Sequence, residues 1–245
     1  DNNEISDIYE YGICLYHADN TKVLSNLISN PRRDKKFGVL MWGASCNNLV
    51  KGNEILDFKR GISLHYDSDN NQIVNNLVSN SEIDIIIDNS NNNIIYHNNF
   101  EDSQIEGFDN GNNEWSYNGV GNYWGDYANI ENNETLNYQI PPNGLDSNPS
   151  KTIFSIEPIN TPSLNPIDYS EFQYVSTEIS NNETWEGQNK ELTPVDINGG
   201  SLTITNSTIT FLSHSEGDGL SVSEGGTLKI IDSKIYGNGM YLSAS

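Results

Sequence analysis

Four side chains suited to sugar recognition or to acid–base chemistry recur at matching positions of a repeating sequence. Tyr16, Trp42, His65 and Asp88 each follow a short apolar segment. If these segments are neighbouring strands, stacking brings equivalent side chains to within about 5 Å of one another. Three rings on one flat face can stack on sugar rings. The same column is also typical of packing between strands, or of a face covered by another subunit.

Catalysis would need clustered acids beside a proton carrier. The candidates are His65, Asp88 and Asp67. Asp67 lies in an Asp-Ser-Asp-Asn-Asn turn, where Asp is expected for backbone reasons. With 34 acidic residues in the chain, neighbouring acids also arise by chance. We therefore predict no catalytic site, with a polysaccharide hydrolase or lyase as the alternative.

A recurring asparagine marks the elements that would position these residues. Its spacings are 23, 27, 23 and 23, and an apolar residue follows each of the first four asparagines two positions later. The asparagines are Asn3, Asn26, Asn53, Asn76 and Asn99, the apolar residues are Ile5, Ile28, Ile55 and Val78, and a further apolar column holds Val23, Leu49, Ile73 and Ile94 or Ile95. A fixed period of this length indicates a repeat architecture.

Each period holds three short strands with one buried face, separated by turns of Asn, Asp, Ser and Gly. This pattern predicts an all-β, right-handed parallel β-helix, a solenoid in which each coil pairs only with its neighbours. The asparagine column predicts an inward amide ladder that links one coil to the next.

The repeat divides the chain into three parts. Residues 1–105 predict a β-helix of about four to five coils, and 106–170 an irregular aromatic, Pro- and Asn-rich cap and linker. Residues 171–245 predict a second β-helical segment with a period of 26, incomplete at its C-terminal end. We expect open strand edges where the segments begin and end, and a chain excised from a longer precursor.

Charge and composition exclude several classes of partner. A net charge of −22 disfavours nucleic acid and anionic lipid. No apolar run has the length of a membrane span. The four histidines lack metal-ligand spacing, so no metal or cofactor is expected. Cys14 and Cys46 fall in adjacent coils at different positions, and their pairing stays open.

The sequence also predicts two kinds of surface feature, a basic loop and glycosylation sequons. The long second coil predicts a projecting basic loop that docks on another copy or on an anionic wall polymer, or that is simply solvated. Its basic residues are Arg32, Arg33, Lys35 and Lys36. Glycosylation sequons occur at Asn133, Asn182 and Asn206, no more of them than chance would give.

The coil from Gly61 to Phe100 and the closing Asn-Tyr-Trp-Gly-Asp-Tyr of residues 122–127 resemble NosD-like repeats. These are right-handed parallel β-helices of the carbohydrate-binding and sugar-hydrolase type, found in archaeal secreted and surface proteins. The resemblance covers about 1–150 and implies architecture and location more than activity. Copper, named in one label of the family, finds no Met, Cys or His cluster here.

These observations predict an extracellular, cell-surface structural solenoid of the sheath, surface-layer or filament type. Its expected partners are copies of itself, other envelope proteins or polysaccharide. The alternative is a glycan-binding module, or a polysaccharide-degrading enzyme, that uses the face from Tyr16 to Asp88.

Overall fold

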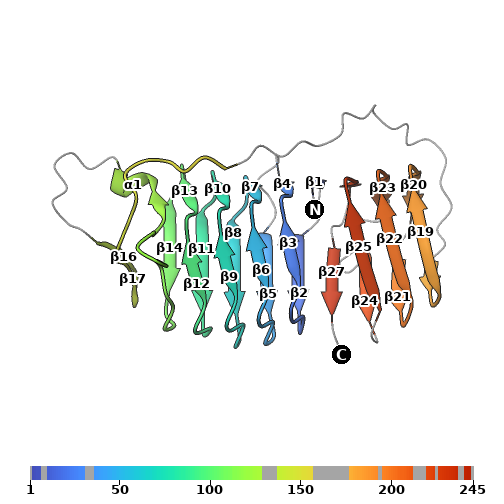
Figure 1. The fold of residues 1–245 in the computed structure, drawn as a ribbon, viewed down its shortest axis with the longest axis horizontal. Coiled ribbons are helices and arrows are strands. Elements are labelled where there is room, and N and C mark those ends of the chain that lie inside the picture. The colour runs from blue at the N-terminus through green and yellow to red at the C-terminus, as the bar shows by residue number, and fades with distance from the viewer. Residues whose placement is uncertain are drawn as a thin grey trace.

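A computed structural model describes residues 2–6, 10–30, 36–128, 137–156, 177–192, 195–211, 219–223, 226–236 and 240–243. The protein is a parallel β-helix whose coils stack along one axis (Figure 1). In its described part, the hairpin of β16 and β17 is the one antiparallel pair of named strands, and α1 (Gly125–Ala128) is the one helix. The predicted fold class is confirmed.

Two sheets of nine strands run the length of the solenoid, and shorter sheets form its remaining face. In spatial order the first sheet holds β15 (Tyr123–Trp124), β13 (Asn99–Glu101), β10 (Leu77–Ser79), β7 (Glu54–Leu56), β4 (Leu27–Ser29), β1 (Glu4–Ser6), β26 (Lys234–Tyr236), β23 (Thr208–Phe211) and β20 (Asn189–Leu192). The second holds β14 (Ile105–Asp109), β11 (Ile83–Asp88), β8 (Arg60–His65), β5 (Phe37–Trp42), β2 (Tyr11–Tyr16), β27 (Met240–Ser243), β24 (Leu220–Ser223), β21 (Val195–Asn198) and β18 (Thr177–Ile179). The remaining strands are β12 (Ile94–Tyr96), β9 (Gln72–Val74), β6 (Leu49–Lys51) and β3 (Lys22–Leu24), then β19 (Asn182–Glu186), β22 (Ser201–Thr205) and β25 (Thr227–Ile231), and the hairpin β16 (Tyr138–Ile140) and β17 (Gly144–Asp146).

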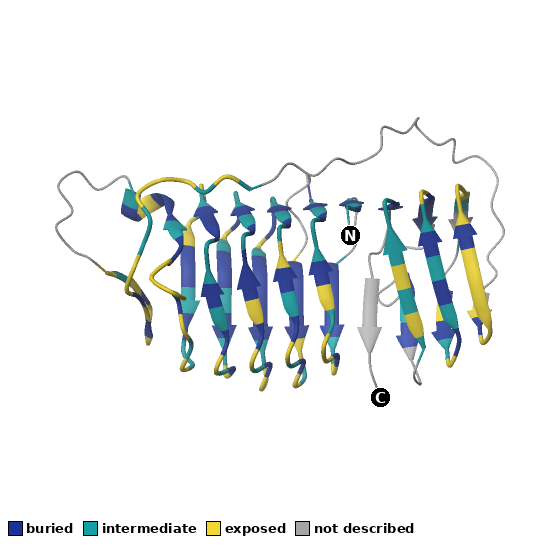
Figure 2. Cartoon of the chain, in the orientation of Figure 1, coloured by how far each residue is buried: buried dark blue, intermediate teal, exposed yellow. Residues whose placement is uncertain are grey.

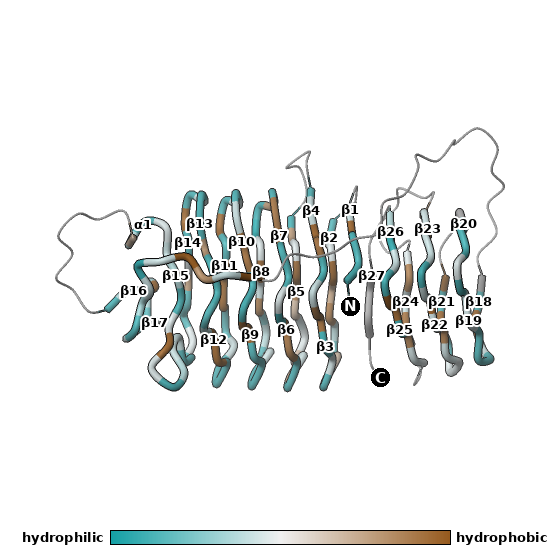
Figure 3. The backbone as a smooth tube through the Cα atoms, turned by 45° about the horizontal axis from the view of Figure 1, so that its top comes forward, coloured by the Kyte–Doolittle hydropathy of each residue, from teal (hydrophilic) through white to brown (hydrophobic). Residues whose placement is uncertain are grey.

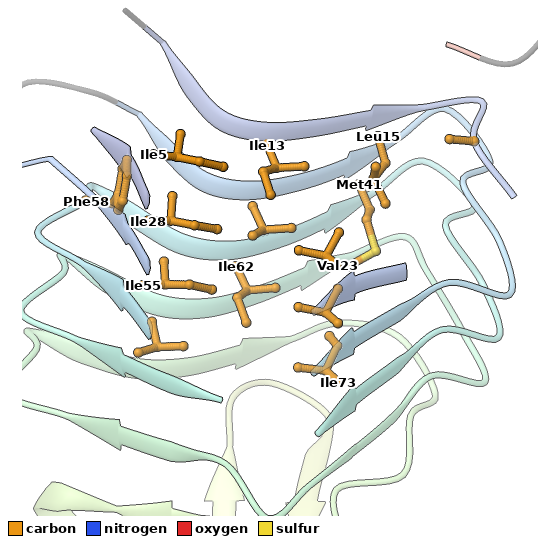
Figure 4. Close-up of a cluster of buried hydrophobic side chains, with 14 of the residues drawn as sticks. Ile5, Ile13, Leu15, Val23, Ile28, Met41, Ile55, Phe58, Ile62 and Ile73 are labelled. Carbon is orange, nitrogen blue, oxygen red and sulfur yellow. The ribbon is translucent and has the colours of Figure 1, made fainter. Parts of the chain in front are cut away.

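Stacked apolar columns form the core, as the strand period requires. Ile5, Ile28 and Ile55 lie one above the other and are fully buried (Figure 4). Hydrophobic positions recur from coil to coil between hydrophilic turns (Figure 3). Buried residues lie mainly along the strands of the N-terminal segment, whereas β19 at the outer end of the C-terminal segment is largely exposed (Figure 2). The column predicted at Leu49 runs instead through Val50, which pairs with Val23 and Ile73. Leu49 is only half-buried, because alternation along the strand turns it outward.

The asparagine ladder is present, with one correction. Each side-chain amide donates to the Oδ1 of the next rung at 2.8–2.9 Å from Asn3 to Asn76. The following rung is Asn98, not Asn99, and Asn98 continues the ladder to Asn122. The reason is a coil one residue shorter than assumed, so that Asn99 pairs with Leu77 instead. Phe100, buried two positions after Asn98, was the sequence signal.

A second amide ladder, which was not predicted from the sequence, runs along another corner of the same coils. Asn71 donates to Asn93, and Asn93 to Asn113, at 3.1 and 2.9 Å. Asn48 joins them through its backbone N–H, which donates to the Oδ1 of Asn71 at 2.9 Å. These asparagines repeat with nearly the same period as the first ladder, which is the signal that could have found them.

The C-terminal segment does not extend the solenoid beyond the cap. It returns to the N-terminal end of the chain, so that β26 pairs with β1 and β27 with β2 in the middle of the stack (Figure 1). On two of the three faces, the ends that were expected to be open are therefore paired with each other. We call this junction of β1 and β2 with β26 and β27 the seam.

Aromatic side chains cover the far end of the N-terminal segment. Regular pairing continues past residue 105, since β14 pairs with β11 and β15 with β13. Trp124 lies at the centre of the cap, with the ring centroids of Phe100, Trp115 and Tyr138 at 4.8, 5.7 and 4.4 Å. The ladder ends here on Asp146, which accepts hydrogen bonds from Asn122 and from the indole N–H of Trp124.

Candidate functional site

The four residues predicted to form a column are in register on adjacent strands. Tyr16 ends β2 and pairs with Trp42 at the end of β5, which pairs with His65 at the end of β8. His65 in turn pairs with Asp88 at the end of β11. The same backbone geometry follows each of these strands. The next residue has a positive φ, between 50° and 65°, and turns the chain sharply.

These turns assemble exposed rings into a continuous surface. We call Tyr16, His17, Trp42 and Tyr66 the aromatic strip. The centroid of the Trp42 ring lies 5.1 Å from that of Tyr16 and 6.1 Å from that of Tyr66. Trp42 is 40% exposed and Tyr66 59%, so the strip presents ring faces and edges to solvent. Tyr66 was missed from the sequence because it lies one residue past the predicted column.

A glycine shapes the middle of the strip. Gly43 follows Trp42 with φ of 65°, and a Cβ at this position would lie 2.8 Å from the ring of Tyr16. A side chain here would therefore displace that ring as well as strain the backbone. The turn holds Tyr16 against the Trp42 ring and leaves the solvent side of Trp42 open.

The structure brings His65 and Asp88 close without making them an acid–base pair. Nδ1 of His65 lies 3.6 Å from Oδ2 of Asp88, longer than a hydrogen bond. The other carboxylate oxygen of Asp88 accepts from the side-chain amide of Asn110 at 2.5 Å. Burial, and then the charge of Arg60, lower the pKa of His65 against the opposing effect of Asp88. The imidazole is thus a neutral ring at the edge of the strip.

Asp67 serves the turn rather than the column. Its φ is 60°, and its N–H donates to the carbonyl of Asn89 in the next coil at 2.8 Å. Its own carbonyl accepts from the thiol of Cys46. Cys46 and Cys14 are both free thiols, which answers the open question of their pairing.

The remaining predicted sites are only partly described. Arg32, Arg33, Lys35 and Asn133 lie outside the described residues. Lys36 is exposed, and its Nζ pairs with Oε1 of Glu10 at 2.6 Å. Asn182 and Asn206 are both exposed, as an acceptor for a glycan must be, and glycosylation stays a prediction.

Another group of acids, not found from the sequence, lies beneath the cap. Glu106 is 6% exposed, and its Oε1 accepts from the N–H of Asp126 at 2.9 Å. Burial and the neighbouring Asp126 carboxyl raise the pKa of Glu106 to about 9. The hydroxyl of Tyr138 donates to Asp126 at 3.0 Å. With its pKa raised to about 9, this largely buried carboxyl is neutral at neutral pH.

Comparison with known proteins assigns the chain to a family. A family model described as periplasmic copper-binding protein (NosD) matches residues 1–129, more than half of the chain. The chain belongs to the NosD family. No curated protein sequence matches it. Among solved structures, a double mutant of the periplasmic alginate epimerase AlgG matches with a TM-score of 0.38 and 14% identity. The match covers 99% of this chain and 49% of the epimerase, so the chain spans about half of that protein's length.

The NosD family is described as copper-binding, but the described residues contain no set of copper ligands. No group of three or more His, Cys, Asp or Glu side chains there has the geometry to hold a metal ion. Nδ1 of His97 bonds to the side chain of Asn75 at 3.0 Å. Burial, and then the charge of Glu10, raise the pKa of Cys14 to about 12, which keeps the thiol protonated. These residues do not fit copper.

The NosD family is described as periplasmic, which is consistent with the expected location outside the cytoplasm, while a location at the cell surface stays a prediction. Across the described residues, no helix combines the length and hydropathy needed to span a bilayer.

Proposed function

We propose that this NosD-family solenoid works in the cell envelope and binds polysaccharide along the aromatic strip. The observation that carries the proposal is the exposure of Trp42, 40% of whose surface is open between the rings of Tyr16 and Tyr66. A soluble protein rarely exposes an indole among other rings without a use for it. Stacking on the faces of sugar rings uses this geometry and needs no catalytic group.

Charge selects the class of polysaccharide. The turns that follow the four strands, residues 16–21, 42–48, 65–71 and 88–93, contain acidic side chains and no Lys or Arg. The acids are Asp19, Asp67, Asp69 and Asp88. A polyuronate would bring its carboxylates against this surface and be repelled. The proposed ligand is therefore a neutral glycan or one that carries amino sugars.

The test is binding to a panel of neutral glycans, amino-sugar polymers and polyuronates, measured by affinity electrophoresis. We expect binding to at least one neutral or amino-sugar polymer. Trp42→Ala should weaken it about five- to tenfold, because each stacked ring contributes about 1 kcal/mol. Tyr117→Ala is the matched control, since Tyr117 is an aromatic residue that is 45% exposed at the cap. Preference for polyuronates, or equal loss in both variants, would contradict the proposal.

A second candidate function is that of a self-associating structural solenoid. It is favoured by the outer edge of the C-terminal segment, where β18, β19 and β20 each end their sheet in the described part of the chain. Unpaired strand edges are templates for strand addition. Electron microscopy and light scattering across a concentration series test it: ordered filaments or discrete oligomers support it, and a monomer at every concentration contradicts it.

A further inference from the structure

The seam differs from the other coil junctions because it joins strands from opposite ends of the chain. Ile5 of β1 pairs with Ile235 of β26, and Ile13 of β2 with Met240 of β27. Among the described residues the remaining face is not joined there, since β3 ends one sheet and β25 ends another. The seam thus holds two of the three faces that a complete junction holds.

Polar side chains of the two segments meet across the seam, where the side-chain amide of Asn2 donates to Oδ1 of Asp232 at 3.2 Å. Nζ of Lys234 lies 2.6 Å from Oε2 of Glu4, and both side chains are largely buried, at 9% and 23% exposure. The amide ladder also weakens here: the N–H of Ser233 donates to the Oδ1 of Asn3 at 3.2 Å, without the bond between side-chain amides found in the coils that follow. One complementary charge pair therefore marks the place where the two segments recognise each other.

The connection between the two segments is long enough for the C-terminal segment to dock either on its own chain or on a second copy. The last residues before it bond to β13, where the carbonyl of Phe154 accepts from the side chain of Asn99. From β13 to β20 the sheet takes seven strand steps, about 34 Å at about 4.8 Å per step. The twenty residues 157–176 can extend to about 70 Å. Length alone does not confine the C-terminal segment to its own chain.

We propose that the C-terminal segment, residues 177–243, also docks on β1 and β2 of a second copy of this chain. The exchange replaces one seam by an identical seam between molecules, so that the strand pairs and the Lys234–Glu4 contact are conserved. At low protein concentration the covalent connection favours the closed monomer, and at high concentration exchange links solenoids. This inference rests on the self-association proposed above and adds the seam to the outer edge as a second contact surface for it. It is independent of glycan binding.

Charge reversal tests the exchange. The variant Glu4→Lys places a second positive charge against Lys234 of the same chain, and the variant Lys234→Glu places a second negative charge against Glu4. Each variant therefore disfavours its own closed seam. When the two variants are unfolded together in urea and refolded as a mixture, reciprocal exchange restores opposite charges at both seams. We expect a dimer by light scattering that neither variant forms alone, and a monomer for the double variant. A mixture that only sums the profiles of its two components would overturn the inference.

The control uses an ion pair of equal length within the N-terminal segment. Glu10 and Lys36 are also 2.6 Å apart but belong to neighbouring coils of one segment, so mixing Glu10→Lys with Lys36→Glu should give no dimer. If wild-type protein associates while the Glu4 and Lys234 variants do not complement each other, self-association uses another surface. If nothing associates, both proposals fail.

A cysteine trap does not depend on the charge variants folding. Ser6 and Tyr236 are partners across the seam, so a disulfide between them forms within one chain in the double variant Ser6→Cys/Tyr236→Cys. In a concentrated mixture of the two single variants, exchange gives a heterodimer on non-reducing gels. Its absence, alongside efficient closure of the double variant, overturns the inference, and Ser6→Cys mixed with wild type is the control.

Discussion

The two segments of the solenoid place different polar side chains at the same corner of the coil. In the N-terminal segment this residue is asparagine, and each Asn both accepts from the rung before it and donates to the rung after it. In the C-terminal segment it is serine: the N–H of Ser207 donates to Oγ of Ser233 at 3.1 Å. The Ser233 hydroxyl donates back to the carbonyl of Ile231 in its own coil at 2.7 Å.

An amide has two donors and two acceptor positions, whereas a hydroxyl has one donor. Asparagine can therefore close its own turn and still bind the next coil, while serine gives its proton to its own turn. Two segments of one fold can therefore share strand geometry and core and still differ in how tightly successive coils are held together. The C-terminal segment should open first, and it is the segment that we propose exchanges.

The largest effect is expected when the polar side chain at this corner of the coil is removed from each segment in turn. The Asn53 side chain accepts from the backbone and the amide of Asn26, and donates to Val23 and Asn76. Asn53→Ala should lower the free energy of unfolding by about 3–5 kcal/mol, because it leaves several buried partners unpaired. Ser207→Ala should cost about 1–2 kcal/mol. Urea denaturation measures both, and equal losses would remove the distinction.

The second test uses pH to weaken the N-terminal segment alone. The ordinary pKa of Glu106 is 4.5 and the folded value is about 9, so between these values the folded state holds a proton that the unfolded state has lost. The free energy of unfolding therefore falls as pH rises from about 4.5 to about 9. Glu106→Gln should flatten this dependence and stabilise the cap at pH 8 by about 1–2 kcal/mol.

Thermal unfolding at several pH values measures the effect. The matched control is Glu186→Gln, which changes an exposed carboxyl of the C-terminal segment. If the dependence on pH survives in Glu106→Gln, another group must be responsible for it.

The smallest test strengthens the C-terminal segment instead. The hydroxyl of Thr210 in β23 is buried and has no hydrogen-bond partner among the residues that the structure describes. Thr210→Val keeps the shape and removes the unsatisfied group, so it should stabilise this segment by about 0.5–1 kcal/mol. Hydrogen exchange of β22 and β23 amides reports the gain locally. A loss of stability would mean that the hydroxyl has a partner within the folded protein.

Much of this architecture could be predicted from spacing alone, because a stacked coil repeats its inward residues at nearly constant intervals. The columns through Ile28 and the register of Trp42 with His65 follow from that rule. The rule failed by one residue at Asn98, where a coil of 22 residues replaces one of 23. The spacing rule could not predict the seam, since a period gives the number of residues in a coil but not which distant coil stacks on it.

Tyr66 shows the same limit within the candidate site. The ring enters the strip from a turn residue with φ of 54°, outside the alternation that predicts strand faces. The buried Glu106 was equally hidden, because its surroundings come from the cap rather than from its own strand.

The seam also changes the relation between gene order and spatial order. Along the axis, the strands run from β18 to β27 and then from β1 to β15. The chain instead begins in the middle, runs out to the cap, and then returns from the opposite end to the middle. The protein therefore has the topology of a circular permutant of an uninterrupted solenoid. A gene that encoded 177–243 first and 2–156 second would make the seam a contact between successive coils. Its contact order would fall, and folding of such a chain should be faster.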